Sequence, residues 1–383
     1  MTPVIFSPDV HYIEFSIKYL TLCGLWNPYK DYRKWLYDIY TIFIVVFMYF
    51  TRIDAYFLAA QAFKQNFLQE TLIMFLESAF VVGIFKIINI LWHRADIEFI
   101  ATTLTWERTL LCSKNVAVYR DQVVGETLRI SKKITLIWLG LVVVDLVLFY
   151  RDNLIGNRRS IDDLPLGLTF LGRFLQKLNF FVILAIDYST LVLSCAIIMS
   201  NDCLCLTLML HIETQLKILN FRLRRCTTQT TSYFNPNQEL IMCIQHYQKI
   251  FRMVRILQRV YGSLLLPQLL SSIILISVVG IHIFVTKSVD PTDPVSAGVV
   301  IMTLISGLTQ LGIYCLGGNN ILVESDRTSV MVYDSYWYMA DTEFKKNMII
   351  FLSMVENPLS IKAVGLFELS YVTFKSVSYI TYN

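Results

Sequence analysis

Apolar residues occur in long blocks along the chain, and polar segments rich in lysine and arginine separate the blocks. A helix needs about 20 mainly apolar residues to cross the hydrocarbon core of a bilayer. Seven blocks are predicted as spanning helices: 36–60, 71–91, 134–150, 174–200, 264–285, 295–316 and 359–380. The pattern therefore predicts an all-α membrane protein with seven transmembrane helices.

The distribution of basic residues predicts the orientation of these helices. Lysine and arginine number 22 in the N-terminal segment and the second, fourth and sixth connections. The opposite connections hold five, with two more at the head of the fourth span. Because cytoplasmic loops carry an excess of these residues, we expect a cytoplasmic N-terminus. Seven spans then place the C-terminus outside, which is an inverted topology relative to G-protein-coupled receptors.

The inner connections are long and have a helical pattern. The fourth span continues beyond the membrane with apolar residues near helical spacing: Leu208, Ile212, Leu216, Leu219 and Leu223. Asn235-Pro236 is typical of a helix start, because proline fits the first helical position. Residues 240–261 alternate apolar and basic side chains at the same period. We therefore expect a cytoplasmic helical layer beneath the membrane.

Composition supports a membrane protein and excludes other classes. The chain is 55% hydrophobic and 16% charged, whereas soluble domains carry about 25% charged residues. The net charge of +4 has no dense basic patch, so we expect no nucleic-acid partner. Catalytic and phosphate-binding signatures are absent from the sequence and its five histidines are scattered, which predicts no enzyme, metal or cofactor. The eight cysteines are expected as buried thiols.

Seven spans also invite comparison with G-protein-coupled receptors. The predicted topology is opposite, and no Asp/Glu-Arg-Tyr sequence ends the third span. Asn357-Pro358 lies before the last span, and the residue before a proline leaves the α region, so one helix should end there. A G-protein-coupled receptor is therefore the less favoured alternative.

The seventh block is the most polar. On a helix, Glu368, Tyr371, Lys375 and Ser378 would share one face, because they are three or four residues apart. Charged residues within a span face protein or water rather than lipid. The face could form an ion pair between helices, or it could line an aqueous pore.

Aromatic residues gather in the outer halves of spans two to four, near two isolated acids. Asp145 and Asp187 are the single acids of the third and fourth spans. Burying an unpaired carboxylate is costly, so each should form a hydrogen bond, protonate or meet a cavity. The aromatic residues could form core, or they could enclose a small apolar ligand.

Two sequence elements resemble the insect odorant receptor family. Within 345–379, a short helix and a proline break lead into a Gly-Leu-Phe-Glu-Leu-Ser core, 365–370, and the last helix. Gly24-Leu25-Trp26 is followed by Asn27-Pro28, similar to the family's Gly-Leu-Trp-Pro element with an inserted Asn. Length, seven spans and inverted topology agree with this family over the whole chain.

The resemblance implies a subunit of an odorant-gated, non-selective cation channel in the plasma membrane of a sensory neuron. Such a subunit assembles with a conserved co-receptor subunit into a heterotetramer. A small volatile ligand binds in the outer half of the bundle, between spans two, three, four and six. Coupling runs through spans five and six to the seventh, which lines the pore for permeating cations. A gustatory receptor of the same superfamily is an alternative with the same topology.

The resemblance also implies roles for individual residues. The expected ligand-binding residues are Phe75, Ala79, Asp145, Phe149, Tyr150, Phe180, Leu184 and Tyr188, with Asp145, Tyr150 and Tyr188 as polar contacts. The expected pore-lining residues are Glu368, Tyr371, Lys375, Val377 and Ser378. Lys375 is unusual for a cation pore, and the chain ends at Asn383, a few residues earlier than typical members. Both features favour a heteromer in which the co-receptor supplies most of the gate.

Six parts are expected along the chain. They are a cytoplasmic segment with an amphipathic helix (1–35), spans one to four with the ligand site (36–200), a cytoplasmic anchor extension of spans four and five (201–262), spans five and six (263–316), cytoplasmic anchor helices (317–357) and the pore-lining seventh span (358–383).

Overall fold

A computed structural model gives the fold of the chain. It describes residues 14–29, 31–50, 67–108, 114–154, 179–227, 235–285 and 294–380. The α-helices are α1 (Glu14–Leu22), α2 (Arg33–Phe50), α4 (Phe67–Trp92), α5 (Arg94–Arg108), α6 (Lys114–Leu154), α8 (Phe180–Arg225), α9 (Pro236–Val285), α10 (Pro294–Tyr333), α11 (Thr342–Val355) and α12 (Tyr371–Ile380). A 3₁₀ turn spans Trp337–Met339, and two short strands are β1 (Lys362–Ala363) and β2 (Phe367–Glu368).

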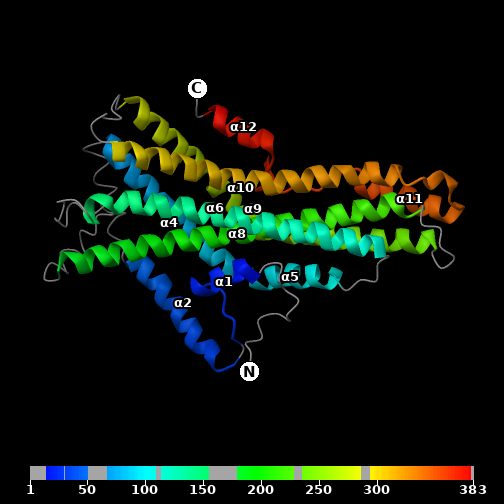
Figure 1. Cartoon of the computed structure of the whole chain (residues 1–383), viewed down its shortest axis with the longest axis horizontal. Helices are drawn as coiled ribbons and strands as arrows, with labels where there is room; N and C mark the ends of the chain where they lie inside the picture. The colour runs from blue at the N-terminus through cyan, green and yellow to red at the C-terminus, as the bar shows by residue number, and fades with distance from the viewer. Residues whose placement is uncertain are drawn as a thin grey trace.

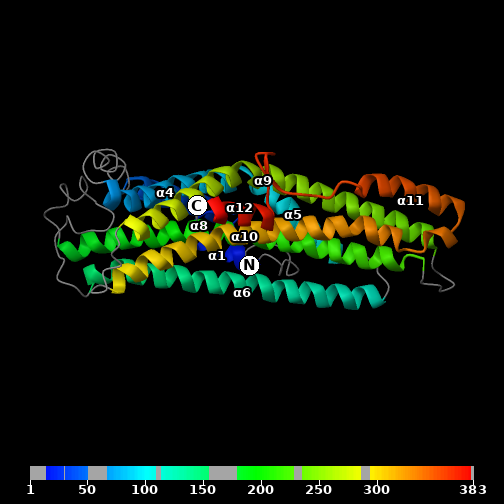
Figure 2. The ribbon, with the colours of Figure 1, turned by 90° about the horizontal axis from the view of Figure 1, so that it is seen from above.

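Four long helices, α6, α8, α9 and α10, run side by side along the length of the molecule (Figure 1, Figure 2). Helix α8 has 46 residues, which at 1.5 Å per residue is about 69 Å. The hydrocarbon core of a bilayer is only about 30 Å thick. Each long helix can therefore cross a membrane with one part and extend beyond it with the other.

The long helices contain the membrane-crossing stretches expected for spans three to six. Within the described residues, four helical stretches are long and apolar enough to cross: Asn115–Tyr150, Phe180–Arg225, Pro236–Gly280 and Ile301–Met339. A shorter apolar helix, Phe80–Trp92, covers the second half of the predicted second span and ends one residue beyond it. Helix α2 covers the first part of the predicted first span, and residues 51–60 lie outside the described residues.

The helical layer predicted beyond the membrane is present. Helix α8 continues without a break to Arg225, and the apolar positions predicted to share a face are all fully buried: Leu208, Ile212, Leu216, Leu219 and Leu223. Helix α9 begins at Pro236, and the Asn235 side chain accepts a hydrogen bond from the backbone N–H of Asn237 at 3.0 Å. This capping bond satisfies one of the free N–H groups of the first turn.

Helix α11 has the bounds expected for the short helix before the proline break. It begins after Asp341, whose carboxylate accepts a hydrogen bond from the backbone N–H of Phe344 at 2.8 Å. Phe344, Met348 and Phe351 are buried on one face of α11. These residues dock α11 on α9 and α10.

The predicted helix over 359–380 is wrong in its first half. Residues 362–363 pair antiparallel with 367–368, and α12 begins only at Tyr371. Val364 and Gly365 have φ angles of 48° and 73°, which a right-handed helix cannot contain. Glu368 therefore lies in β2 and not on the helical face of Tyr371 and Lys375.

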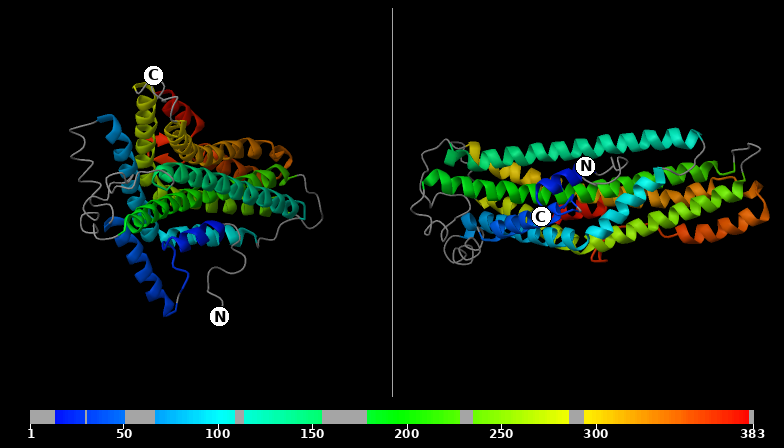
Figure 3. Two further views of the ribbon diagram at one scale, coloured as in Figure 1. Left: turned by 60° about the vertical axis from the view of Figure 1, so that its left-hand side comes forward. Right: turned by 90° about the horizontal axis from the view of Figure 1, so that it is seen from below.

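The strand pair is fixed to α9. The Gln258 side chain accepts a hydrogen bond from the Lys362 backbone N–H at 2.7 Å and donates one to the Lys362 carbonyl at 2.6 Å. The Val364 backbone N–H donates to the Gly262 carbonyl at 3.0 Å. After this turn, α12 packs on α10, on the opposite side of the long helices from α1 (Figure 3).

Candidate functional site

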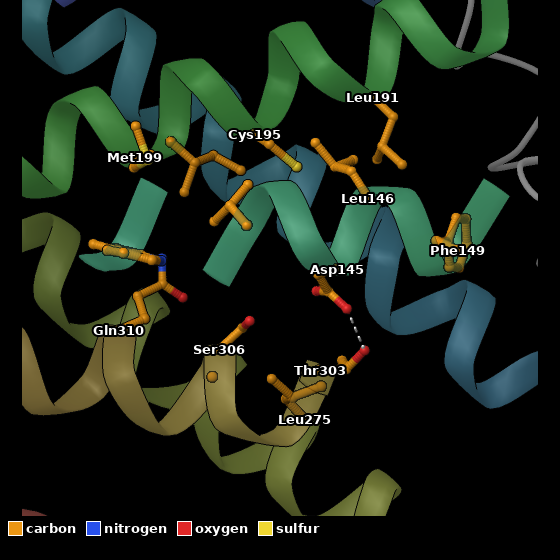
Figure 4. A pocket seen from close by; sticks show the side chains of 14 residues that line it. Asp145, Leu146, Phe149, Leu191, Cys195, Met199, Leu275, Thr303, Ser306 and Gln310 are labelled. Carbon is orange, nitrogen blue, oxygen red and sulfur yellow. Dashed lines mark hydrogen bonds between the residues drawn. The ribbon is translucent and has the colours of Figure 1, made fainter. Parts of the chain in front are cut away.

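A cavity of about 160 Å³ lies between α6, α8 and α10, with one side chain from α9 (Figure 4). Its walls are mainly apolar: Trp138, Val142, Leu146 and Phe149 from α6, Leu191, Cys195, Ile198 and Met199 from α8, and Leu275 from α9. Such a site, apolar with a few convergent polar groups, is the usual form of a small-molecule pocket. Among the described lining residues none comes from α4, the helix of the predicted second span.

The polar groups of the cavity lie on facing sides of α6 and α10. Asp145 extends from α6, and its Oδ1 accepts a hydrogen bond from the Thr303 hydroxyl at 3.5 Å. Ser306, Gly307 and Gln310 line the cavity from α10. In Figure 4 the side chains of Asp145 and Ser306 point into the space between the two helices. Asp145 is thus the predicted acid that meets a cavity.

The other predicted acid, Asp187, forms a hydrogen bond between helices. Its Oδ2 accepts from the Tyr150 hydroxyl at 2.9 Å, and both residues are fully buried. The Tyr188 ring stands edge-on to the Tyr150 ring, with centroids 5.0 Å apart. The Tyr150 ring also contacts Phe149, with centroids 5.6 Å apart. Tyr150 and Tyr188 therefore form a layer behind the cavity wall, connected to it through Phe149.

The remaining predicted ligand-binding residues occupy different surroundings. Leu184 is buried in the core, and Phe180 contacts Phe181 at the start of α8. Phe75 and Ala79 belong to a stretch of α4 whose side chains lie outside the described part of the structure. Asp145 and Phe149 are thus the predicted residues that line the cavity.

A buried ion pair borders the inner end of the cavity. Lys86 Nζ of α4 lies 2.5 Å from Asp202 Oδ1 of α8, and both side chains are almost fully buried. Gln310 of the cavity wall donates from Nε2 to Asp202 Oδ2 at 2.7 Å, and the Tyr314 hydroxyl donates to Asp202 Oδ1. Lys86 lies near the end of the predicted second span, and no local sequence pattern indicates Asp202, 116 residues away, as its partner.

The ion pair, Gln310 and Tyr314 form a largely buried polar cluster whose stability depends on all of its members. Removing one partner of a buried pair leaves an uncompensated charge and costs about 3–5 kcal/mol. Gln310 and Tyr314 satisfy both oxygens of Asp202. Gln310 is therefore shared between the cavity wall and the cluster.

Helix α10 connects the cavity to α12. A side chain at Gly318 would meet the Leu369 carbonyl oxygen at 2.7 Å, so glycine permits close packing against the chain just before α12. The Asn319 side chain accepts a hydrogen bond from the Tyr371 backbone N–H at 3.3 Å. The same helix therefore carries Ser306 and Gln310 in the cavity and contacts the start of α12.

Helix α12 is short and leaves one side uncovered. The Ser370 hydroxyl accepts a hydrogen bond from the Thr373 backbone N–H at 3.3 Å, which caps the helix. Phe374 packs towards the core, whereas Tyr371 and Lys375, one turn apart, are exposed. The side chains of Val377 and Ser378 lie outside the described part of the structure.

Comparison with known proteins identifies the family. The family described as 7tm Odorant receptor matches residues 66–382. Odorant receptor 2a of Drosophila melanogaster is 27% identical over 148 residues, which are 38% of this chain and 36% of that protein. The Odorant receptor coreceptor of Aedes aegypti is 25% identical over 154 residues, 37% of this chain and 31% of that protein. The chain thus matches about a third of the length of these curated relatives.

Solved structures share the fold over nearly the whole chain. The insect olfactory receptor OR5 from Machilis hrabei superposes with a TM-score of 0.82 at 14% identity, covering 98% of this chain and 97% of that one. The same receptor in complex with eugenol superposes with a TM-score of 0.79 at 15% identity and the same coverage. The predicted seven-transmembrane-helix fold is therefore confirmed. The family consists of receptors rather than enzymes, as predicted, and the chain belongs to the 7tm odorant receptor family.

Proposed function

We propose that the chain is the ligand-tuning subunit of an odorant-gated, non-selective cation channel. The observation that carries this proposal is the apolar cavity with a polar side, built on the same helix that contacts α12. Its volume and lining suit a small, mainly apolar molecule. A receptor with this fold has been solved in complex with eugenol, itself a small molecule.

The ligand site of this proposal centres on the cavity. Both Phe149 and Asp145 line the cavity, so Phe149 forms part of its apolar wall and Asp145 offers a polar contact to the ligand. Tyr150, Tyr188, Leu184 and Phe180 act from the surrounding layer, where they set the position of Phe149 and the start of α8. Phe75 and Ala79 of α4 complete the predicted set.

The pore of this proposal is lined by α12 from each subunit. The uncovered side of α12 carries Tyr371 and Lys375, and the helix continues to Val377 and Ser378. Glu368 lies just before the helix, at the mouth of such a pore. Lys375 would repel cations in a pore made only of this chain, which supports assembly with a co-receptor subunit in a heterotetramer of the sensory-neuron plasma membrane.

Opening of the pore requires that the ligand binds the open state more tightly than the closed state. Helix α10 offers the route, because Ser306 and Gln310 in the cavity and Asn319 beside α12 lie on it. A shift of α10 on ligand binding would therefore move the start of α12.

Electrophysiology of cells that co-express the chain and an insect odorant co-receptor tests the proposal. Phe149→Ala should raise the half-maximal ligand concentration about 3- to 10-fold, since Phe149 is half-buried and full burial of a Phe side chain contributes about 1.5–3 kcal/mol. Ile301→Ala is the matched control, because Ile301 lies on α10 with an exposed side chain. Equal dose–response curves for both variants would exclude this cavity as the ligand site, and currents without the co-receptor would contradict the heteromer.

A further inference from the structure

The cavity contains a hydroxyl group with unused hydrogen-bonding capacity. Ser306 Oγ is buried and has no hydrogen-bond partner among the described residues. A buried polar atom without a partner costs about 1–3 kcal/mol. Ser306 lines the cavity and points into it (Figure 4), so a bound molecule can reach this atom.

The Gln310 amide presents its oxygen to the cavity. Asp202 Oδ2 accepts a hydrogen bond from Gln310 Nε2 at 2.7 Å, and a carboxylate in an ion pair can only accept. This partner fixes the orientation of the amide, which leaves Oε1 as the group turned away from Asp202. Within the described part of the chain, nothing donates to Oε1.

Asp145 adds a second acceptor from the opposite side of the cavity. Its Oδ1 accepts from the Thr303 hydroxyl, and Oδ2 has no hydrogen bond to a described residue. Thr303, Ser306 and Gln310 are three and four residues apart, so they share the face of α10 that looks towards Asp145. Among the described residues that line the cavity, the free polar atoms are thus two acceptors and one hydroxyl that can both donate and accept.

The volume restricts the apolar part of the ligand. An apolar cavity of about 150 Å³ accommodates benzene, and this cavity measures about 160 Å³. Trp138, Leu146 and Leu191 surround most of it with apolar surface. The ligand therefore has about one ring or a short chain besides its polar group.

From these groups we infer that the cavity selects a small alcohol or phenol, whose hydroxyl donates to Gln310 or Asp145 and accepts from Ser306. A single hydroxyl can donate to one of the free acceptors and accept from Ser306 at the same time. A ketone, ester or ether can only accept, and leaves the acceptors of Asp145 and Gln310 unused. An ammonium ion can donate to these oxygens but leaves the Ser306 hydrogen unused, and it must also lose its water shell to enter a mainly apolar cavity. This inference rests on the proposed function for its biological meaning, but it concerns binding alone.

Trp138 allows binding to be measured without channel activity. It lines the cavity, so the tryptophan fluorescence of the purified full-length chain should change when the cavity fills. The probes are cyclohexanol, cyclohexanone, cyclohexylamine and methylcyclohexane, which are matched in size and differ in the polar group. We expect cyclohexanol to bind about 3- to 10-fold more tightly than the others, which is the effect of one hydrogen bond. Trp138→Phe should abolish the ligand-induced change in fluorescence.

Two variants test whether Ser306 causes the preference for cyclohexanol. Ser306→Ala should weaken cyclohexanol about 3- to 10-fold and leave methylcyclohexane unchanged. Ser306→Thr keeps the hydroxyl, so the four probes should bind with the same order of affinity as in the parent chain. Thr309→Ala is the matched control, because Thr309 lies on the same helix and its hydroxyl donates to the Ile305 carbonyl at 2.8 Å, away from the cavity.

The outcomes separate this inference from the proposed function. Tighter binding of cyclohexanone or cyclohexylamine than of cyclohexanol would overturn the inference, as would equal affinities for Ser306→Ala and the parent chain. Preferential binding of cyclohexanol without ligand-evoked current in the co-expressed channel would support the inference and contradict the proposed function.

Discussion

Two regions of the same long helices differ in what their polar side chains face. The pocket region, formed by 134–150, 180–199, 264–280 and 298–313, holds the cavity and leaves the Ser306 hydroxyl without a partner among the described residues. The anchor region, formed by 200–225, 236–262, 314–333 and 342–355, contributes no described residue to this cavity, although Asn220 Oδ1 and Tyr261 Oη are also buried without a described partner. Several polar pairs join its helices. Arg222 and Glu239 are 2.9 Å apart, and Asn320 donates to Glu213 at 2.8 Å.

In the proposed function, the pocket region recognises the ligand and the anchor region holds the long helices together. Paired polar groups in a low-dielectric interior fix the register of the helices that carry them. Unpaired groups beside a cavity are costly until a ligand supplies the missing bonds. A ligand in the cavity could reach the unpaired hydroxyl of the pocket region, whereas the ion pairs of the anchor region form within one chain. The buried Lys86–Asp202 pair lies at the boundary between them.

Breaking this boundary pair should have the largest effect. Asp202→Ala leaves the Lys86 charge buried without its partner, and we expect a loss of about 3–5 kcal/mol of stability. Cell-surface expression of an epitope-tagged chain should fall strongly. The double variant Lys86→Met with Asp202→Leu removes both charges and should recover much of the expression. Normal expression of Asp202→Ala would show that the two regions do not depend on this pair.

Gly318 tests the contact between α10 and the chain before α12. Gly318→Ala places a methyl group 2.7 Å from the Leu369 carbonyl oxygen, and such overpacking costs about 1–3 kcal/mol. Ligand-evoked current should fall, while ligand binding measured by Trp138 fluorescence stays unchanged. Gly312→Ala is the control on the same helix, because its new methyl group would lie 3.8 Å from Phe374. Equal currents in both variants would argue against coupling through this contact.

The anchor region should tolerate a loss of pairing with no effect on ligand recognition. Glu239→Ala leaves Arg222, a 3% exposed side chain, without its carboxylate, and we expect a loss of about 1.5–3 kcal/mol of stability. Thermal unfolding of the purified chain measures it. Glu98→Ala is the control, because the Arg94–Glu98 pair is largely exposed and exposed pairs contribute about 0–1 kcal/mol. Altered ligand affinity in Glu239→Ala would contradict the separation of the two regions.

The smallest effect concerns cysteine reactivity. Burial raises the pKa of the Cys226 thiol to about 12, since desolvation disfavours the thiolate. Cys226 should therefore stay unlabelled by a small maleimide at pH 7–8, and labelling should rise only as the pH approaches 12. Cys195 lines the cavity, so a bound ligand should slow its labelling. Mass spectrometry measures the labelling of Cys195 and Cys226 with and without cyclohexanol. Protection of Cys226 by the ligand, with no protection of Cys195, would contradict this expectation.

Much of the fold follows from the sequence because its signals are local. Apolar blocks and helical periodicity predicted the spans and the helical layer, and Asn235-Pro236 predicted the start of α9. The start of α12 was placed too early, because the left-handed backbone of Val364 and Gly365 interrupts a stretch that reads as apolar helix. The aromatic residues near Asp145 led to a predicted ligand site in this part of the bundle. The sequence pattern did not distinguish Phe149, which lines the cavity, from Tyr150, which lies behind it.

The sequence by itself determined the class of protein, the order of its spanning helices and its family, because hydropathy, charge distribution and short motifs are properties of neighbouring residues. Only the tertiary structure decided which polar groups meet. Lys86 and Asp202 are 116 residues apart, and Thr303 and Asp145 are 158 apart. Such partners are set by the packing of helices distant along the chain, and the same packing left Ser306 facing a cavity.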